Sequence, residues 1–115
     1  MVTRYVPHRS DVVWLTFEPR AGSEQAGRRP ALVISPETYN DKVGLALVCP
    51  ITKQVKGYPF EVAIPSGFDV KGVVLADQLK SLDWRVRRAE YLGRVSSEVL
   101  DEVVGKLRTL IEIDV

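Results

Sequence analysis

The chain has 115 residues, of which 45% are hydrophobic and 27% are charged, a composition typical of one folded globular domain. No apolar stretch approaches the roughly 20 residues that a membrane-spanning helix needs, and the first residues show no signal-peptide pattern. We therefore expect a single domain over residues 1–115, located in the cytoplasm and not in a membrane.

The net charge of +1 conceals an asymmetry along the chain. From Ser96 onward, five acidic residues outnumber two basic ones, which gives −3, so the first 95 residues carry +4. A basic body suits a polyanionic partner, although the excess is small.

Short runs of β-branched and aromatic residues, separated by polar segments with glycine and proline, indicate a mainly β protein. Polar loops are expected over residues 18–29 and 52–59, and a turn or single helical turn over 36–43. The run that begins at residue 72 is expected to continue through residues 77–79 toward Trp84. Strands are predicted over residues 11–17, 30–35, 44–50, 60–64, 72–76 and 91–95.

The pattern changes to a helical period after Ser96, which predicts an amphipathic helix over about residues 97–112. Ser96 or Ser97 can cap its first turn, and Glu98 and Asp101 suit the positive end of the helix dipole. Several short strands with one terminal helix favour a small β-barrel over about residues 10–95 with a helix packed against it.

The loop before the second predicted strand carries the most distinctive polar cluster: Glu24, which lies between Gly22 and Gly27, and Arg28 and Arg29, which follow Gly27. An acid and two guanidinium groups at the edge of a sheet suit the chemistry of phosphate, because a planar guanidinium matches phosphate oxygens.

Other catalytic classes are disfavoured by residue counts. The single histidine, His8, excludes a two-histidine ribonuclease mechanism, and no glycine-framed serine elbow is present. The single cysteine, Cys49, lies in an apolar run, so we expect it to be a small buried hydrophobic residue. Zinc-ligand spacing is absent, so no metal or other cofactor is expected.

The residues that remain can cleave RNA without a metal ion. Glu24 can take the proton of the 2′-hydroxyl, Arg29 can bind the phosphate, and Thr52 can donate a hydrogen bond to it. Lys56 and Arg28 can add positive charge. Phe17, Tyr58 and Trp84 are candidate platforms for stacked bases of single-stranded RNA, although Trp14 and Trp84 read more simply as packing residues.

Several segments resemble the MazF toxins of bacterial toxin–antitoxin modules. They include Asp11-Val-Val-Trp, Gly22-Ser-Glu-Gln-Ala-Gly-Arg-Arg-Pro, Pro50-Ile-Thr, Lys56-Gly-Tyr-Pro-Phe-Glu-Val and Val74-Leu-Ala-Asp-Gln-Leu-Lys-Ser. The likeness covers nearly the whole chain, and the Gly-Ser-Glu-Gln block is its most specific part. The family usually has glycine where this chain has Ser10, and Thr16 and Lys53 also depart from its pattern.

The resemblance implies an SH3-like barrel that forms a homodimer and cuts single-stranded mRNA at short sequences without ribosome or metal. The products would be a 2′,3′-cyclic phosphate and a 5′-hydroxyl. Glu24, Arg29 and Thr52 carry over as catalytic, and Gln25, Lys56, Asp77 and Gln78 as RNA contacts. The implied partner is a MazE-like antitoxin, through which the complex would bind its own operator DNA.

Two alternatives stay open. The first is a non-catalytic toxin of the CcdB kind, which poisons DNA gyrase; such toxins lack the Glu24–Arg29 pair and carry a C-terminal tryptophan that this chain lacks. The second is a degenerate copy that binds RNA or antitoxin without cutting.

Overall fold

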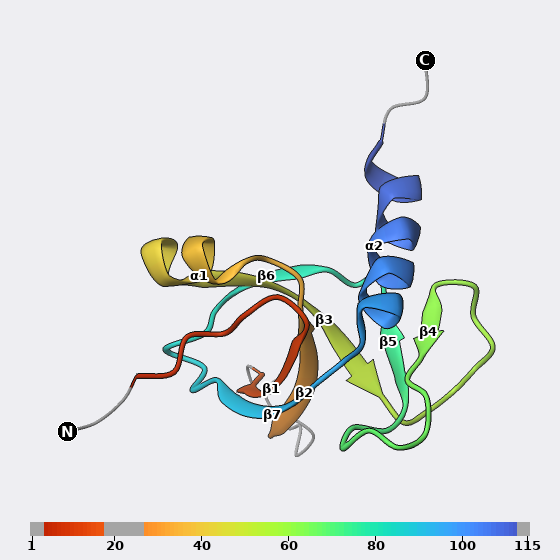
Figure 1. The fold of residues 1–115 in the computed structure, drawn as a ribbon, viewed down its shortest axis with the longest axis horizontal. Helices are drawn as coiled ribbons and strands as arrows, with labels where there is room; N and C mark the ends of the chain where they lie inside the picture. The colour runs from red at the N-terminus through yellow and green to blue at the C-terminus, as the bar shows by residue number, and fades with distance from the viewer. Residues whose placement is uncertain (1–3, 18–26, 113–115) are drawn as a thin grey trace, which may run out of the picture.

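The computed structural model describes residues 4–17 and 27–112, in which a curved antiparallel sheet packs against one long helix (Figure 1). The elements in chain order are β1 (Asp11–Thr16), β2 (Arg28–Val33), α1 (Glu37–Val43), β3 (Leu45–Thr52), β4 (Glu61–Ala63), β5 (Val73–Leu75), β6 (Lys80–Asp83), β7 (Glu90–Arg94) and α2 (Ser97–Ile111). The predicted fold class, mainly β with a C-terminal helix, is confirmed.

The strands follow the order β4-β5-β3-β2-β1-β7, and β6 also pairs with β3. The first half of β3 pairs with β6 from Leu45 to Val48, and its end pairs with β5 at Ile51 and Thr52. Among the described strands no ladder joins β4 to β7, so closure into a barrel stays a prediction.

Neighbouring residues of the central strands belong to two different apolar clusters, one on each face of the sheet. Val12, Leu32 and Cys49 belong to the cluster that α2 covers, whereas their neighbours Val13, Val33 and Val48 belong to the cluster around Trp84. Because both faces are buried, these strands read as continuous apolar runs in the sequence. The expected burial of Cys49 and Trp84 is confirmed.

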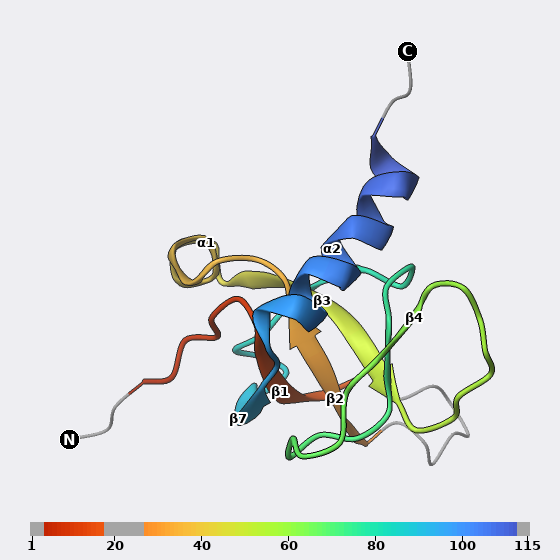
Figure 2. The same ribbon diagram turned by 45° about the vertical axis from the view of Figure 1, so that its right-hand side comes forward.

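Helix α2 begins where its capping residue predicts, since the Ser96 side chain accepts a hydrogen bond from the Val99 N–H at 3.3 Å. Val99, Val103 and Leu107 recur at a spacing of four and face the sheet. The last turn extends beyond the sheet (Figure 2), where Leu110 and Ile111 are exposed. No helix within residues 4–17 and 27–112 is long and apolar enough to cross a membrane.

Two expectations about element boundaries are wrong. Strand β2 begins at Arg28, so both arginines lie in the strand and not in the preceding loop, because Arg28 and Arg29 pair with Thr16 and Leu15 of β1. The run after β5 does not continue as one strand: the chain turns after Leu75, and β6 is a separate strand. The expected turn over residues 36–43 contains the seven-residue helix α1.

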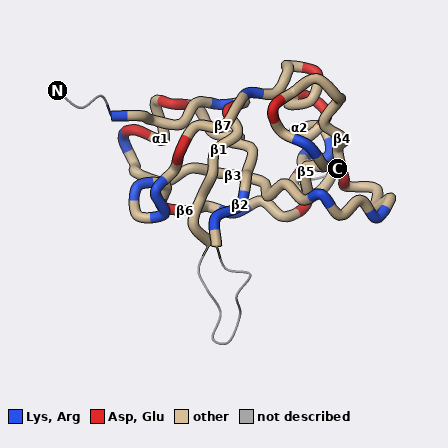
Figure 3. The backbone as a smooth tube through the Cα atoms, turned by 90° about the horizontal axis from the view of Figure 1, so that it is seen from below, with Lys and Arg blue, Asp and Glu red and all other residues tan. Residues whose placement is uncertain are grey.

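Basic and acidic residues are interspersed in the view of Figure 3. The charge asymmetry of the sequence therefore does not produce one large basic face in that view. Any site for a polyanion has to be a local arrangement of side chains.

Asn40 of α1 is fully buried and ties together segments that are far apart in the chain. Its side-chain amide donates to the carbonyls of Pro7 and Ser35 at 2.8 and 3.1 Å, and its Oδ1 accepts from the Ser35 hydroxyl at 2.6 Å. Its backbone carbonyl accepts from Trp84 Nε1 at 2.9 Å. This residue therefore anchors the N-terminal segment and the turn after β2.

Ser10 adopts a left-handed backbone conformation, with φ of +82°. Its N–H donates to the Val33 carbonyl at 2.9 Å, and its carbonyl accepts from the Val95 N–H at 3.0 Å. Both bonds depend on this conformation, which glycine adopts without the steric cost that a Cβ brings. A glycine at this position would make both bonds without that cost.

We predict that Asn40→Ala lowers the free energy of unfolding by about 3 kcal/mol, because buried groups of Pro7 and Ser35 lose their partners. Urea denaturation measures the change. Lys42→Ala, on the exposed side of the same helix, is the control and is expected to change stability by less than about 0.5 kcal/mol. Equal effects of the two substitutions would contradict the anchoring role.

We predict that Ser10→Gly raises the free energy of unfolding by about 0.5–1 kcal/mol, because it relieves the left-handed strain. Ser10→Ala is the matched control, since it removes the hydroxyl but keeps the strained Cβ. A gain from alanine as large as that from glycine would show that the side chain, and not φ, sets the stability.

Candidate functional site

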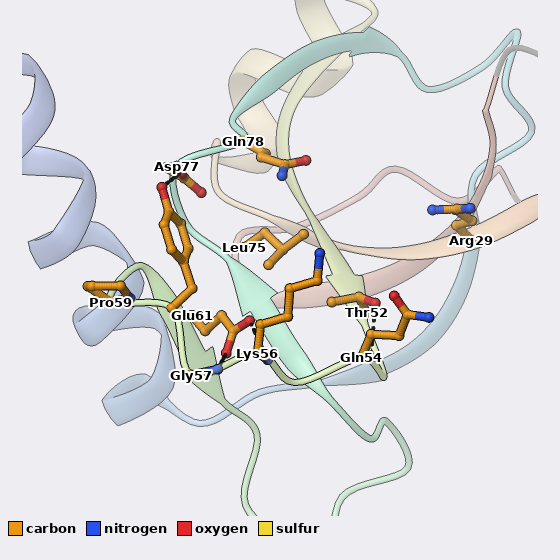
Figure 4. A pocket seen from close by; sticks show the side chains of 11 residues that line it. Arg29, Thr52, Gln54, Lys56, Gly57, Pro59, Glu61, Leu75, Asp77 and Gln78 are labelled. Atoms are coloured by element: carbon orange, nitrogen blue, oxygen red, sulfur yellow. Dashed lines mark hydrogen bonds between the residues drawn. The ribbon is translucent and has the colours of Figure 1, made fainter.

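A groove of about 650 Å³ opens where β2, the end of β3, β5 and the loop between β3 and β4 meet (Figure 4). Six of the residues predicted from sequence for catalysis or RNA contact line it: Arg29, Thr52, Lys56, Tyr58, Asp77 and Gln78. The remaining lining residues are Gln54, Gly57, Pro59, Glu61 and Leu75.

Arg29 reaches the groove because of its position in β2, where neighbouring side chains point to opposite faces. In Figure 4 it lies on the opposite side of the groove from Asp77. Its side chain is exposed, and no hydrogen bond within residues 4–17 and 27–112 engages its guanidinium.

Arg28 points away from this groove and is bound within the protein. Its guanidinium donates to Thr16 Oγ1 at 2.8 Å and to the Arg88 carbonyl at 2.6 Å, and it pairs with Glu90 at 3.3 Å. The structure thus gives Arg28 the role of joining β1, β2 and β7, and it does not bring the residue together with the other predicted RNA contacts.

Thr52 is the last residue of β3, and its hydroxyl oxygen accepts the Gln54 N–H at 3.1 Å. Among the described residues, no acceptor engages the hydroxyl hydrogen of Thr52. Gly72 lies against the same residue: a Cβ at position 72 would come within 2.2 Å of the Thr52 carbonyl oxygen. Only glycine therefore permits the close approach that fixes the end of β3.

Asp77 forms the far wall together with Tyr58, whose hydroxyl donates to Asp77 Oδ2 at 2.7 Å. This hydrogen bond and the negative charge of Asp77 raise the pKa of Tyr58. The other carboxylate oxygen, Oδ1, is buried without a hydrogen-bond partner among the described residues. Within residues 4–17 and 27–112, Asp77 thus engages a donor through Oδ2 alone.

The remaining predicted residues lie elsewhere. Phe17 packs against the cluster around Trp84 and does not line the groove. Glu24 and Gln25 lie outside the described residues. Tyr58 does line the groove, as its predicted stacking role requires, whereas Trp84 is buried and donates to Asn40.

Sequence reasoning missed Glu61 and Gln54 as parts of the site. Glu61 accepts hydrogen bonds from the backbone of the preceding loop, and a sequence pattern does not reveal such contacts. The only signal was its place in the Lys56–Val62 segment that resembles the MazF toxins.

The single cysteine and the single histidine do not line the groove. Burial, with a contribution from the negative charge of Asp77, raises the pKa of the Cys49 thiol to about 12, so it is not a thiolate nucleophile. His8 contacts Asp11 and Glu37, outside the groove. Within residues 4–17 and 27–112 there is no group of three or more potential metal ligands among histidine, cysteine, aspartate and glutamate.

Comparison with known proteins gives consistent results for nearly the whole chain. The chain is 52% identical over 111 residues to the endoribonuclease toxin MazF of Escherichia coli strain K12, covering 96% of this chain and 99% of that protein. It is 33% identical over 100 residues to the endoribonuclease EndoA of Bacillus subtilis strain 168, with 83% and 85% covered.

A solved structure of a MazE–MazF complex from Deinococcus radiodurans contains a chain that superposes with a TM-score of 0.91 at 55% identity, covering 96% of this chain and 100% of that one. Residues 8–111 match the family model described as PemK-like, MazF-like toxin of type II toxin–antitoxin system. The resemblance predicted from the sequence is thereby confirmed, and the chain belongs to the PemK-like, MazF-like toxins of type II toxin–antitoxin systems.

Proposed function

We propose that the protein is an endoribonuclease toxin that cleaves single-stranded RNA, chiefly mRNA, in the groove formed by β2, β3, β5 and the loop between β3 and β4. The observation that carries this proposal is the convergence of Arg29, Thr52 and Lys56 on one groove in a chain of this family. These three groups can bind phosphate oxygens, and they come from three different segments of the chain: β2, β3 and the loop after β3.

The proposed reaction is an internal displacement at phosphorus. The 2′-hydroxyl loses its proton to Glu24, and its oxygen forms a new bond to phosphorus as the bond to the 5′-oxygen breaks. Arg29 binds the charged phosphate oxygens, and the Thr52 hydroxyl hydrogen adds a further hydrogen bond. Arg29, Lys56 or water supplies the proton to the 5′-oxygen, leaving a 2′,3′-cyclic phosphate and a 5′-hydroxyl.

The wall opposite Arg29 is suited to contact with a base. The hydrogen bond to Asp77 holds the Tyr58 side chain in place at the groove, where its ring can stack on a base. Gln78 lines the same wall and offers both a donor and an acceptor. These residues are therefore proposed to contribute to the choice of RNA sequence.

The proposed partners follow from the relatives. Two of the similar Deinococcus radiodurans structures are named as MazE–MazF, and we propose that a MazE-like antitoxin neutralises this protein and carries any operator DNA binding of the complex. We further propose that the protein is a homodimer acting on mRNA in the bacterial cytoplasm.

We predict that Arg29→Ala lowers kcat/KM for RNA cleavage by about 10²–10³-fold, because the charge on the phosphate loses a bound guanidinium. Glu24→Gln is expected to give a loss of at least this size. Both variants should keep the wild-type thermal midpoint and should relieve growth arrest when expressed. Arg108→Ala, which removes the same charge from the exposed face of α2, is the control with unchanged cleavage.

The assay uses a long single-stranded RNA with EDTA present, followed by mapping of both new ends. Cuts at one short sequence with cyclic-phosphate ends are the expected result. A folded, antitoxin-free protein that makes no cuts would overturn the proposal, and inhibition of DNA gyrase would then be measured.

A further inference from the structure

The loop between β3 and β4, residues 53–60, carries Lys56 into the groove although its residues 53–59 are exposed and make no core of their own. An exposed segment keeps one conformation only where specific bonds offset the entropy of ordering it, about 1–2 kcal/mol per residue for the backbone. The bonds that hold this loop therefore decide where the Lys56 ammonium lies.

We propose that Glu61 is a positioning residue for RNA cleavage, which holds the backbone of Lys56 in place through a two-pronged carboxylate contact. The inference rests on the proposed function of the groove and adds a residue to it. Glu61 is the first residue of β4, so it is fixed by pairing with Leu75 of β5.

The geometry of the contact is specific. Glu61 Oε2 accepts the Lys56 N–H at 3.0 Å, and Oε1 accepts the Gly57 N–H at 3.0 Å. Gly57 has a φ of +78°, a conformation that lets two successive N–H groups converge on one anion. Each carboxylate oxygen thus binds one amide, and Figure 4 shows these bonds beneath the Lys56 side chain.

The loop has other attachments, but they engage different residues. Tyr58 binds Asp77, the Tyr58 carbonyl accepts the Glu61 N–H at 3.0 Å, and Lys106 of α2 donates to the Pro59 carbonyl. These bonds fix the second half of the loop. Within the described residues, the peptide N–H of Lys56 donates a hydrogen bond to Glu61 and to no other group.

A direct role of Glu61 in binding phosphate is disfavoured by charge, since a carboxylate repels phosphate oxygens. Its two oxygens already accept charge-assisted hydrogen bonds, which are stronger than neutral ones. Its effect on the reaction therefore passes through Lys56. Misplacement of a catalytic or binding group by about 1 Å can cost on the order of 10²-fold in rate.

The test is a double-mutant cycle on kcat/KM for cleavage of a single-stranded RNA, with Glu61→Gln, Lys56→Ala and the double variant. Glutamine keeps the size of the side chain, but its amide NH₂ faces one of the two N–H groups and cannot accept from it. We expect Glu61→Gln to lower kcat/KM by about 10-fold or more, and to add little once Lys56 is alanine. Glu102→Gln, an exposed site on α2, is the matched control and should leave cleavage unchanged.

Hydrogen exchange gives an independent readout of the same contact. The amides of Lys56 and Gly57 should exchange at least about 10-fold faster in Glu61→Gln, while amides of β3 and α2 keep their wild-type rates. If the wild-type protein cleaves RNA, the positioning role is overturned by either of two results. In the first, Glu61→Gln does not lower kcat/KM; in the second, its effect on kcat/KM is additive with that of Lys56→Ala. If the wild-type protein cuts no RNA, the proposed function fails, and unchanged exchange of the two amides would then overturn the carboxylate contact as well.

Discussion

Strand β3 forms hydrogen bonds with three other strands, β2, β5 and β6. These pairings set the positions of the described strands that line the groove. One edge pairs with β2, while the other edge pairs with β6 along its first half and with β5 at its end. A strand that changes partner along one edge forces the sheet to curve, so β2 and β5 approach the end of β3 from opposite sides. Arg29, Thr52 and Leu75 come together at that end.

The same strand explains why the site is well supported although its side chains are exposed. Residues before Thr52 alternate between two buried clusters, so β3 is packed on both faces. The Gly72 contact then holds its final peptide. A reactive group on the end of such a strand has little freedom to move, which suits the small tolerances of a catalytic site.

Charge in the groove is balanced locally. Arg29 and Lys56 can attract phosphate, while Glu61 and Asp77 each engage neighbouring donors. Because both Glu61 oxygens and one Asp77 oxygen accept hydrogen bonds within the protein, these carboxylates repel phosphate less than free carboxylates would. A protein with a net charge of only +1 can bind a polyanion in this way, because steering and contact depend on the local field.

Much of the fold could be predicted from the sequence, because strand composition, the change of period and the Ser96 cap are local signals. Thr52, Lys56, Asp77 and Gln78 follow apolar runs or belong to a motif that resembles the family, and the structure brings all four to one groove. The different environments of Arg28 and Arg29 could not be predicted, because they depend on where β2 begins and on its register with β1. Strand β6 is not recognisable in the sequence because two of its four residues are exposed and the other two only partly buried. Asn40 is not recognisable because a buried asparagine shows itself only through its distant partners.

The register of β1 with β2 has a consequence for how such chains can vary. The pairs Leu15–Arg29 and Thr16–Arg28 are set by the ladder itself and do not depend on the number of residues in the connection before Gly27. Insertions and deletions in that connection therefore leave Arg29 on its face of the sheet. By contrast, one residue inserted in β2 after Arg29 would move the side chains of Arg28 and Arg29 to the opposite faces of the sheet. The connection can therefore change in length without moving the arginines, while the strand that follows must keep its number of residues.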